Sequence, residues 1–169
     1  MKCYLVRHGQ AVDADAWPGA DAERPLTEKG RARMERAAAA LAALDLDLDA
    51  ILTSPLLRAK QTATIIARAL HAESSLREDA RLGGGFGPEA LAAILSDHAD
   101  ADAVMVVGHE PGMSTTVETL CGAATVFKPG SIACVELARA TSKRGMLLWL
   151  APAKLLAVPR RARDDKGGG

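Results

Sequence analysis

Four side chains that can bind or attack an anion follow short apolar runs in this 169-residue chain. They are Arg7, His8, Arg58 and His109. The apolar runs span residues 3–6, 50–53 and 104–107, and each has the length of a buried strand. Because the loops after parallel strands meet at one edge of a sheet, we expect the four side chains to lie close together.

This combination of side chains suits a negatively charged ligand. Guanidinium forks match the oxygens of a phosphate group, and a neutral imidazole is a good nucleophile near pH 7. Gly9 allows the backbone to approach such a ligand closely. Each residue taken alone is more often structural or solvated, so their shared position after strands is what favours a site. His71 and His98 fall near the ends of predicted helices, and we interpret both as structural.

Short strands alternate with longer helices along the chain. Strands are predicted at residues 3–6, 50–53, 104–107, 131–137 and 146–150, and helices at 56–70, 88–95 and 114–120. A further helix is capped by Thr27 and carries on one face Met34, Ala38, Leu41 and Leu44. Ser54 and Pro55 are the predicted cap and first turn of helix 56–70. The alternation predicts an α/β sandwich in which helices cover a mainly parallel sheet.

The same patterns predict one domain over residues 1–157. Residues 158–169 have no apolar periodicity, and we expect a disordered tail there. The most apolar stretch, residues 146–158, is interrupted by Pro152 and Lys154 and is too short to cross a bilayer. We therefore expect neither a membrane span nor a signal peptide.

Charge and composition argue against several classes of partner. Twenty-one Lys and Arg balance 21 Asp and Glu, and aromatic residues make up only 3% of the chain. The balanced overall charge and the scarcity of stacking side chains argue against a nucleic-acid-binding protein. Cys3, Cys121 and Cys134 lack the spacing of a disulfide framework or a zinc site, which predicts reduced thiols and a cytoplasmic protein.

Three segments resemble the signatures of the histidine phosphatase superfamily, also called the phosphoglycerate mutase-like or RHG family. They are LVRHGQA at residues 5–11, TSPLLRAKQTA at 53–63 and VVGHEPGMS at 106–114. RHG alone is a weak motif, but the three signatures in this order and spacing are a strong one. With RPLTEKG at residues 24–30, the chain resembles most the small SixA-type phosphohistidine phosphatases, over roughly residues 1–157.

The resemblance implies a phosphoglycerate mutase-like, three-layer α/β/α fold and a metal-independent phosphatase. It implies that His8 is the nucleophile that becomes phosphorylated, and that Arg7, Arg58 and His109 hold the phosphoryl group beside Gly9. Phosphoryl transfer needs an in-line nucleophile and positive charge on the equatorial oxygens, so no metal ion or other cofactor is expected here. The expected substrate is a phosphohistidine on a signalling protein. The alternatives are a small phosphomonoester and a non-catalytic module that binds phosphate.

The region that carries an acidic proton donor in larger family members is short here, at residues 74–91. Glu78 and Asp79 are candidates for the general acid, although a solvated acidic pair explains them equally well. Without a lid or a strong acid, we expect a substrate whose leaving group departs easily, such as a phosphoramidate nitrogen.

Two loops have weaker signals. Residues 14–24, with Trp17 and Arg24, are expected either to border the site or to serve as a connection. The glycine-rich residues 83–87 lack the Gly-Lys-Ser/Thr sequence of a phosphate-binding loop, and we interpret them as a connection.

Overall fold

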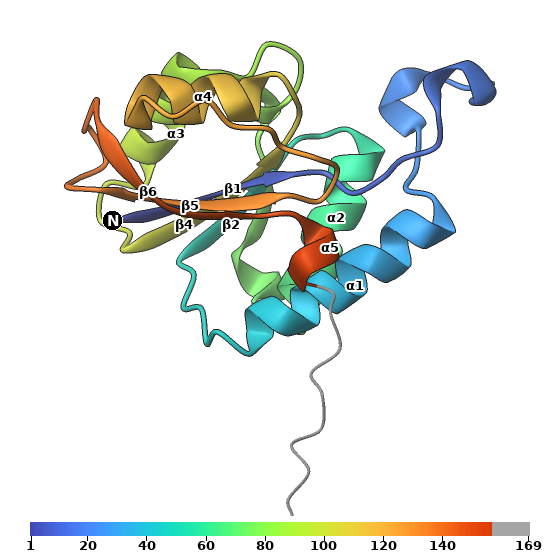
Figure 1. The fold of residues 1–169 in the computed structure, drawn as a ribbon, viewed down its shortest axis with the longest axis horizontal. Coiled ribbons are helices and arrows are strands. Elements are labelled where there is room, and N and C mark those ends of the chain that lie inside the picture. The colour runs from blue at the N-terminus through green and yellow to red at the C-terminus, as the bar shows by residue number, and fades with distance from the viewer. Residues whose placement is uncertain (157–169) are drawn as a thin grey trace, which may run out of the picture.

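The computed structural model describes residues 1–156 and contains a six-stranded sheet with helices on both faces (Figure 1). The strand order is β3-β2-β4-β1-β5-β6. The strands are β1 (Lys2–Arg7), β2 (Ala50–Thr53), β3 (Leu76–Glu78), β4 (Ala103–Gly108), β5 (Ile132–Leu137) and β6 (Gly145–Ala151). In this sheet only β5 runs against the others, since it pairs antiparallel with β1 and β6 while the remaining pairs are parallel. The predicted mainly parallel sheet is confirmed.

The helices form two layers around this sheet (Figure 1). One layer holds α1 (Glu28–Ala42), α2 (Leu57–Ala69) and α5 (Ala153–Leu156), and the other holds α3 (Pro88–Asp97) and α4 (Gly112–Cys121). Because side chains alternate along a strand, Cys3 and Leu5 pack into the core beneath α3 and α4, whereas Tyr4 and Val6 pack towards α1 and α2. Every residue of β4 is buried, as expected for a strand covered on both faces. The three-layer α/β/α fold is confirmed.

The residues before α1 and α2 determine where each helix begins. Thr27 caps α1 as predicted, and its Oγ1 accepts a hydrogen bond from the Gly30 amide at 2.9 Å. The predicted start of the second helix is wrong, because α2 begins at Leu57 and Pro55 lies before it. Ser54 Oγ accepts a 3.3 Å hydrogen bond from the Leu56 amide instead of capping a helix. Its hydroxyl thereby lies at the end of β2, where the functional site forms.

Apart from β2, the elements of three or four residues escaped prediction because they are too short to show a period. These are β3, α5 and the 3-10 helices Ala14–Ala16, Asp21–Glu23, Glu73–Ser75 and Ala80–Leu82. Leu44 was expected on the buried face of the first helix, but it follows the end of α1 and is 54% exposed. The predicted tail at residues 158–169 lies outside the described residues. Among the residues described, no helix is long and apolar enough to span a membrane.

The register of the sheet brings three strand ends to one level. Arg7, the last residue of β1, lies opposite Gly108, the last residue of β4. Thr53, the last residue of β2, lies opposite Val107 of β4. The turns that leave β1, β2 and β4 therefore start at the same edge of the sheet, which is where the sequence predicts a site.

Candidate active site

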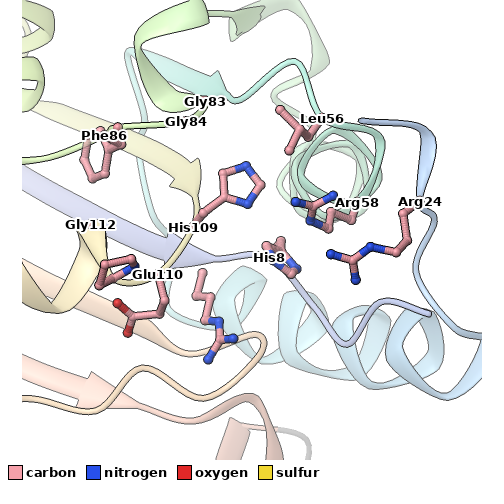
Figure 2. A pocket seen from close by; sticks show the side chains of 13 residues that line it. His8, Arg24, Leu56, Arg58, Gly83, Gly84, Phe86, His109, Glu110 and Gly112 are labelled. Atoms are coloured by element: carbon pink, nitrogen blue, oxygen red, sulfur yellow. The ribbon is translucent and has the colours of Figure 1, made fainter. Parts of the chain in front are cut away.

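A cavity of about 460 Å³ opens at this edge of the sheet. All four residues singled out from the sequence line it, namely Arg7, His8, Arg58 and His109. Figure 2 shows the imidazoles of His8 and His109 close together, with Arg24 and Arg58 on one side of them and Glu110 on the other. The two ring centroids are 5.0 Å apart.

His8 has a defined orientation and protonation. Its Nδ1 lies 2.7 Å from the carbonyl oxygen of Gly9, and because a carbonyl can only accept, Nδ1 carries the proton. The lone pair is therefore on Nε2. Burial is the main cause that lowers the pKa of His8, to about 3, with His109, Arg58 and Arg7 adding to the effect and the Gly9 hydrogen bond opposing it. His8 is thus a neutral imidazole with one free nucleophilic nitrogen at physiological pH.

His109 is held by a residue from another strand. Its Nε2 lies 2.8 Å from Oγ of Ser54, a fully buried serine at the end of β2. Burial and then the charge of Arg58 lower the pKa of His109 to about 4, so this ring is also neutral in the ligand-free protein. A phosphate dianion beside it would raise that pKa and favour the cationic form, which has a further N–H to donate.

The two predicted arginines come from different elements and are anchored differently. Arg58 is buried in the first turn of α2, with Nη1 donating to the Asp21 carbonyl at 2.8 Å and Nη2 to the Asp21 carboxylate at 3.0 Å. Arg7 donates from Nη1 to the Phe127 carbonyl. Each Nη carries two hydrogens, so both guanidinium groups keep donors that the protein does not use. Burial lowers the pKa of Arg7, and the nearby charge of Glu110 opposes that effect.

The loop at residues 14–24 borders the site through Arg24 and Asp21. Arg24 lines the cavity, donates to the carbonyl of Val12 at 2.7 Å and forms an ion pair with Asp21 at 2.9 Å. The hydrogen bond from Arg24 and the charge of Arg58 hold the pKa of the Asp21 carboxyl below its usual range. Trp17 does not line the cavity; its indole N–H donates to the Ala20 carbonyl within the same loop.

Gly9 follows His8 in the chain and does not line the cavity. Its amide donates to Oγ1 of Thr62 at 3.0 Å, while its carbonyl accepts from His8. A Cβ at this position would lie 2.7 Å from Cγ of Met34. The sequence predicted that Gly9 lets the backbone approach a ligand; the close contact in the structure is with the core residue Met34.

Both sequence candidates for a general acid are engaged elsewhere. Glu78 forms a 3.2 Å ion pair with Lys60, and Asp79 pairs with Arg81 and caps the short helix after it. Neither lines the cavity. The acidic residue that does line it is Glu110, which directly follows His109 and for which no sequence pattern indicated a role.

The glycine-rich loop contributes more than a connection. Gly83, Gly84 and Gly85 line the cavity together with Phe86. At Gly112, the first residue of α4, a Cβ would collide with the carbonyl oxygen of Phe86. This close approach of backbone to backbone holds the loop against the turn that carries His109, and it explains how a loop without a phosphate-binding motif reaches the site.

A second cavity of about 490 Å³ adjoins the first and shares with it Arg7, His8 and Arg24. Its other charged lining residues are Arg33, Lys128, Lys154 and Asp13. We call this second cavity the basic groove. Since the whole chain has no net charge, this excess of cations is a local feature that favours an anionic surface.

The site is built from imidazole and guanidinium groups. Within residues 1–156, no three His, Cys, Asp or Glu side chains gather in a way that could hold a metal ion. A neutral nucleophilic nitrogen, a second imidazole and three guanidinium groups around one cavity are the components needed to bind a phosphoryl group and accept it.

Comparison with known proteins agrees with this chemistry. A model of the histidine phosphatase superfamily (branch 1) matches residues 3–83. The chain is 32% identical over 142 residues to phosphohistidine phosphatase SixA of Escherichia coli K12, covering 81% of this chain and 86% of that protein. The chain belongs to the histidine phosphatase superfamily. An uncharacterized relative from Picosynechococcus sp. is 36% identical over 126 residues, which is 71% of this chain and 73% of that protein.

Solved structures of the family have the same architecture. The structure of the protein histidine phosphatase SixA complexed with tungstate has a TM-score of 0.82 and 27% identity, and covers 92% of this chain and 99% of that one. Phosphoglycerate mutase from Bacillus anthracis shares the fold at a TM-score of 0.66 and 15% identity, covering 92% of this chain and 95% of that one. The fold is therefore phosphoglycerate mutase-like, and family membership with SixA similarity makes this chain a phosphatase.

Proposed function

We propose that this protein is a metal-independent phosphohistidine phosphatase that forms a phosphohistidine on its own His8. The observation that carries the proposal is the free Nε2 of His8, fixed by the Nδ1 hydrogen bond to Gly9 and placed among Arg7, Arg58 and His109. In this role Gly9 supports the nucleophile through its carbonyl and does not touch the substrate.

In the first step, Nε2 of His8 attacks the phosphorus atom in line with the leaving group. A bond forms between Nε2 and phosphorus while the bond from phosphorus to the leaving atom breaks and its electron pair departs with that atom. Arg7, Arg58 and His109 donate to the equatorial oxygens, where charge is spread in the transition state. Their donors are positioned before the substrate binds, so little reorganisation is needed during the reaction.

In the second step, water attacks the phosphorylated His8. An oxygen–phosphorus bond forms, the bond to Nε2 breaks, and the electron pair returns to the ring nitrogen. The proton of the water leaves with inorganic phosphate or passes to solvent. The same donors hold the phosphoryl group in both steps, which explains why one set of residues serves the whole cycle.

A phosphohistidine on a protein is the substrate that the site favours. The chain is similar to proteins named phosphohistidine phosphatase and protein histidine phosphatase. The basic groove adjoins the nucleophile, so a macromolecule can bind there while one side chain enters the first cavity. The three cysteines are free thiols, in agreement with a signalling protein of the cytoplasm.

The test is a substrate panel without added metal. A histidine-phosphorylated phosphotransfer protein, p-nitrophenyl phosphate and a set of sugar phosphates are offered to the wild type and to His8→Ala. We expect phosphate release to be fastest from the phosphoprotein and to be lost in the variant. Faster release from a small ester would move the substrate class and keep the nucleophile, whereas turnover that survives in His8→Ala would overturn the mechanism.

A further inference from the structure

Glu110 is the acidic side chain of the active-site cavity and has no part in the mechanism above. It follows His109 at the end of β4 and, within the described residues, is the one carboxylate that lines this cavity. Figure 2 shows it on the side of the two histidines that is opposite Arg24 and Arg58. Because Glu110 and His8 line the same cavity, a substrate that His8 attacks there occupies a space that the Glu110 side chain borders.

The carboxylate of Glu110 is fixed through one of its two oxygens. Oε2 accepts from the Ser114 amide at 3.2 Å and from the Ser114 hydroxyl at 2.8 Å. In the part of the chain that the structure describes, Oε1 accepts no hydrogen bond and Glu110 forms no ion pair within 4.0 Å. One oxygen is therefore anchored to α4 while the other keeps its full capacity as an acceptor.

We propose that Glu110 makes the site selective for phosphohistidine by accepting a hydrogen bond from the second ring nitrogen of the substrate imidazole. This inference rests on the proposed function and adds to it the group that recognises the leaving ring. A carboxylate accepting from an imidazolium N–H is a charge-assisted hydrogen bond, the strong kind.

The contact acts on the reaction through the charge of the leaving group. When the second nitrogen carries a proton, the phosphorus–nitrogen bond breaks with its electron pair going to the first nitrogen, and neutral imidazole leaves. The proton stays on the ring, and none has to be delivered to the leaving atom. Glu110 stabilises this protonated substrate, whereas an alcohol leaving group offers it no N–H, and an acidic sugar or carboxylate near it is repelled. This substrate therefore needs no general acid, and its hydrolysis does not depend on Glu78 or Asp79, which do not line the cavity.

The experiment compares Glu110→Gln with wild type on a histidine-phosphorylated protein and on p-nitrophenyl phosphate. We expect kcat/KM for the phosphoprotein to fall about 10- to 100-fold more than kcat/KM for the ester, the size expected for a hydrogen bond to a charged group. The defect should grow between pH 6 and pH 8.5, because the substrate ring is protonated without help at the lower pH. The matched control is Glu118→Gln, which removes an exposed charge from α4, the helix to which Glu110 is anchored. It should leave both rates unchanged.

Two other results for Glu110→Gln would overturn the inference, and the two can be distinguished from each other. An equal loss on both substrates would show that Glu110 only supports the fold of the site, and no loss would show that it does not contact the leaving ring. Ser114→Ala should reproduce part of the selective loss by releasing Oε2. If wild type hydrolyses the ester through His8 but not the phosphoprotein, the proposed function itself has failed, whatever Glu110→Gln does.

Discussion

The guanidinium of Arg58 donates to both the carbonyl and the carboxylate of Asp21, although these residues are 37 positions apart. Arg58 lies in the first turn of α2 and Asp21 in a short 3-10 helix of the loop after β1. Asp21 also holds Arg24, so one loop residue fixes two of the cations that face the cavity. The loop at residues 14–24 thus positions two of the guanidinium groups that line the cavity.

Replacing these two residues should give effects of different size. Arg58→Lys keeps the charge but loses the fork, and we expect kcat/KM to fall about 100- to 1,000-fold, as when one transition-state donor is removed. Asp21→Ala leaves Arg58 charged but less constrained, and because Asp21 is largely exposed we expect a loss of only about 3- to 10-fold. Steady-state kinetics on one phosphorylated substrate measures both. A loss in Asp21→Ala as large as that in Arg58→Lys would contradict a mere positioning role.

The Ser54 hydroxyl orients His109, so its removal should affect both the activity of the site and the stability of the fold. In Ser54→Ala, Nε2 of His109 loses its protein partner, and we expect kcat to fall about 10-fold with an unfolding free energy lower by about 1–3 kcal/mol. Ser74→Ala removes an exposed hydroxyl and is the matched control. Unchanged kcat in Ser54→Ala would mean that His109 is held by packing alone.

The two half-buried histidines of the site should make stability depend on pH. Their pKa values in the folded protein are about 3 for His8 and about 4 for His109, below the value of roughly 6.5 in an unfolded chain. As pH falls through 6.5, the unfolded chain takes up protons that the folded protein does not, so stability is lost. The slope approaches about 1.4 kcal/mol per pH unit for each histidine.

Urea unfolding at pH 7, 6 and 5 measures this dependence before the carboxylates titrate. We expect the unfolding free energy to decrease over this range in wild type and to decrease less in His8→Ala and in His109→Ala. Equal slopes in wild type and both variants would show that neither imidazole is kept neutral by the fold.

Charge in the basic groove should affect a protein substrate more than a small one. We expect the triple variant Arg33→Gln, Lys128→Gln, Lys154→Gln to raise KM for an acidic phosphoprotein several-fold and to weaken the salt dependence of kcat/KM. The effect on p-nitrophenyl phosphate should be much smaller. Lys143→Gln, an exposed cation in the turn between β5 and β6, is the control. A salt dependence equal to that of wild type would exclude the groove as the docking surface.

The sequence predicted the parts of the site that lie directly after strands. Short apolar runs predict that Arg7, His8 and His109 reach one edge of the sheet. The structure adds that β1 and β4 are a parallel pair whose ends lie level. Ser54 was identified, but as a helix cap, because the pattern Ser-Pro cannot reveal that the helix starts later and that the hydroxyl faces another strand's histidine.

Contacts made across loops were beyond prediction. Asp21 reaches Arg58 from a loop whose regular structure is two 3-10 helices of three residues each, too short to show a period. Glu110 was overlooked since an acid beside His109 carries no spacing signal, and its place in the cavity depends on where the turn after β4 directs the side chain. The sequence pattern drew attention instead to Glu78 and Asp79. Folding brings Lys60 to Glu78, and Asp79 pairs with Arg81, two residues further along the chain.

The central claim is that His8 carries the phosphoryl group during turnover, and trapping that intermediate tests it most directly. The protein would be mixed with a ³²P-labelled phosphohistidine protein, quenched in alkali within milliseconds, and digested for peptide mapping, with His8→Ala run in parallel. We predict an alkali-stable, acid-labile label on the peptide that contains His8 and none in the variant. A label on any other residue, or turnover in wild type with no protein-bound label at the shortest times, would contradict the account.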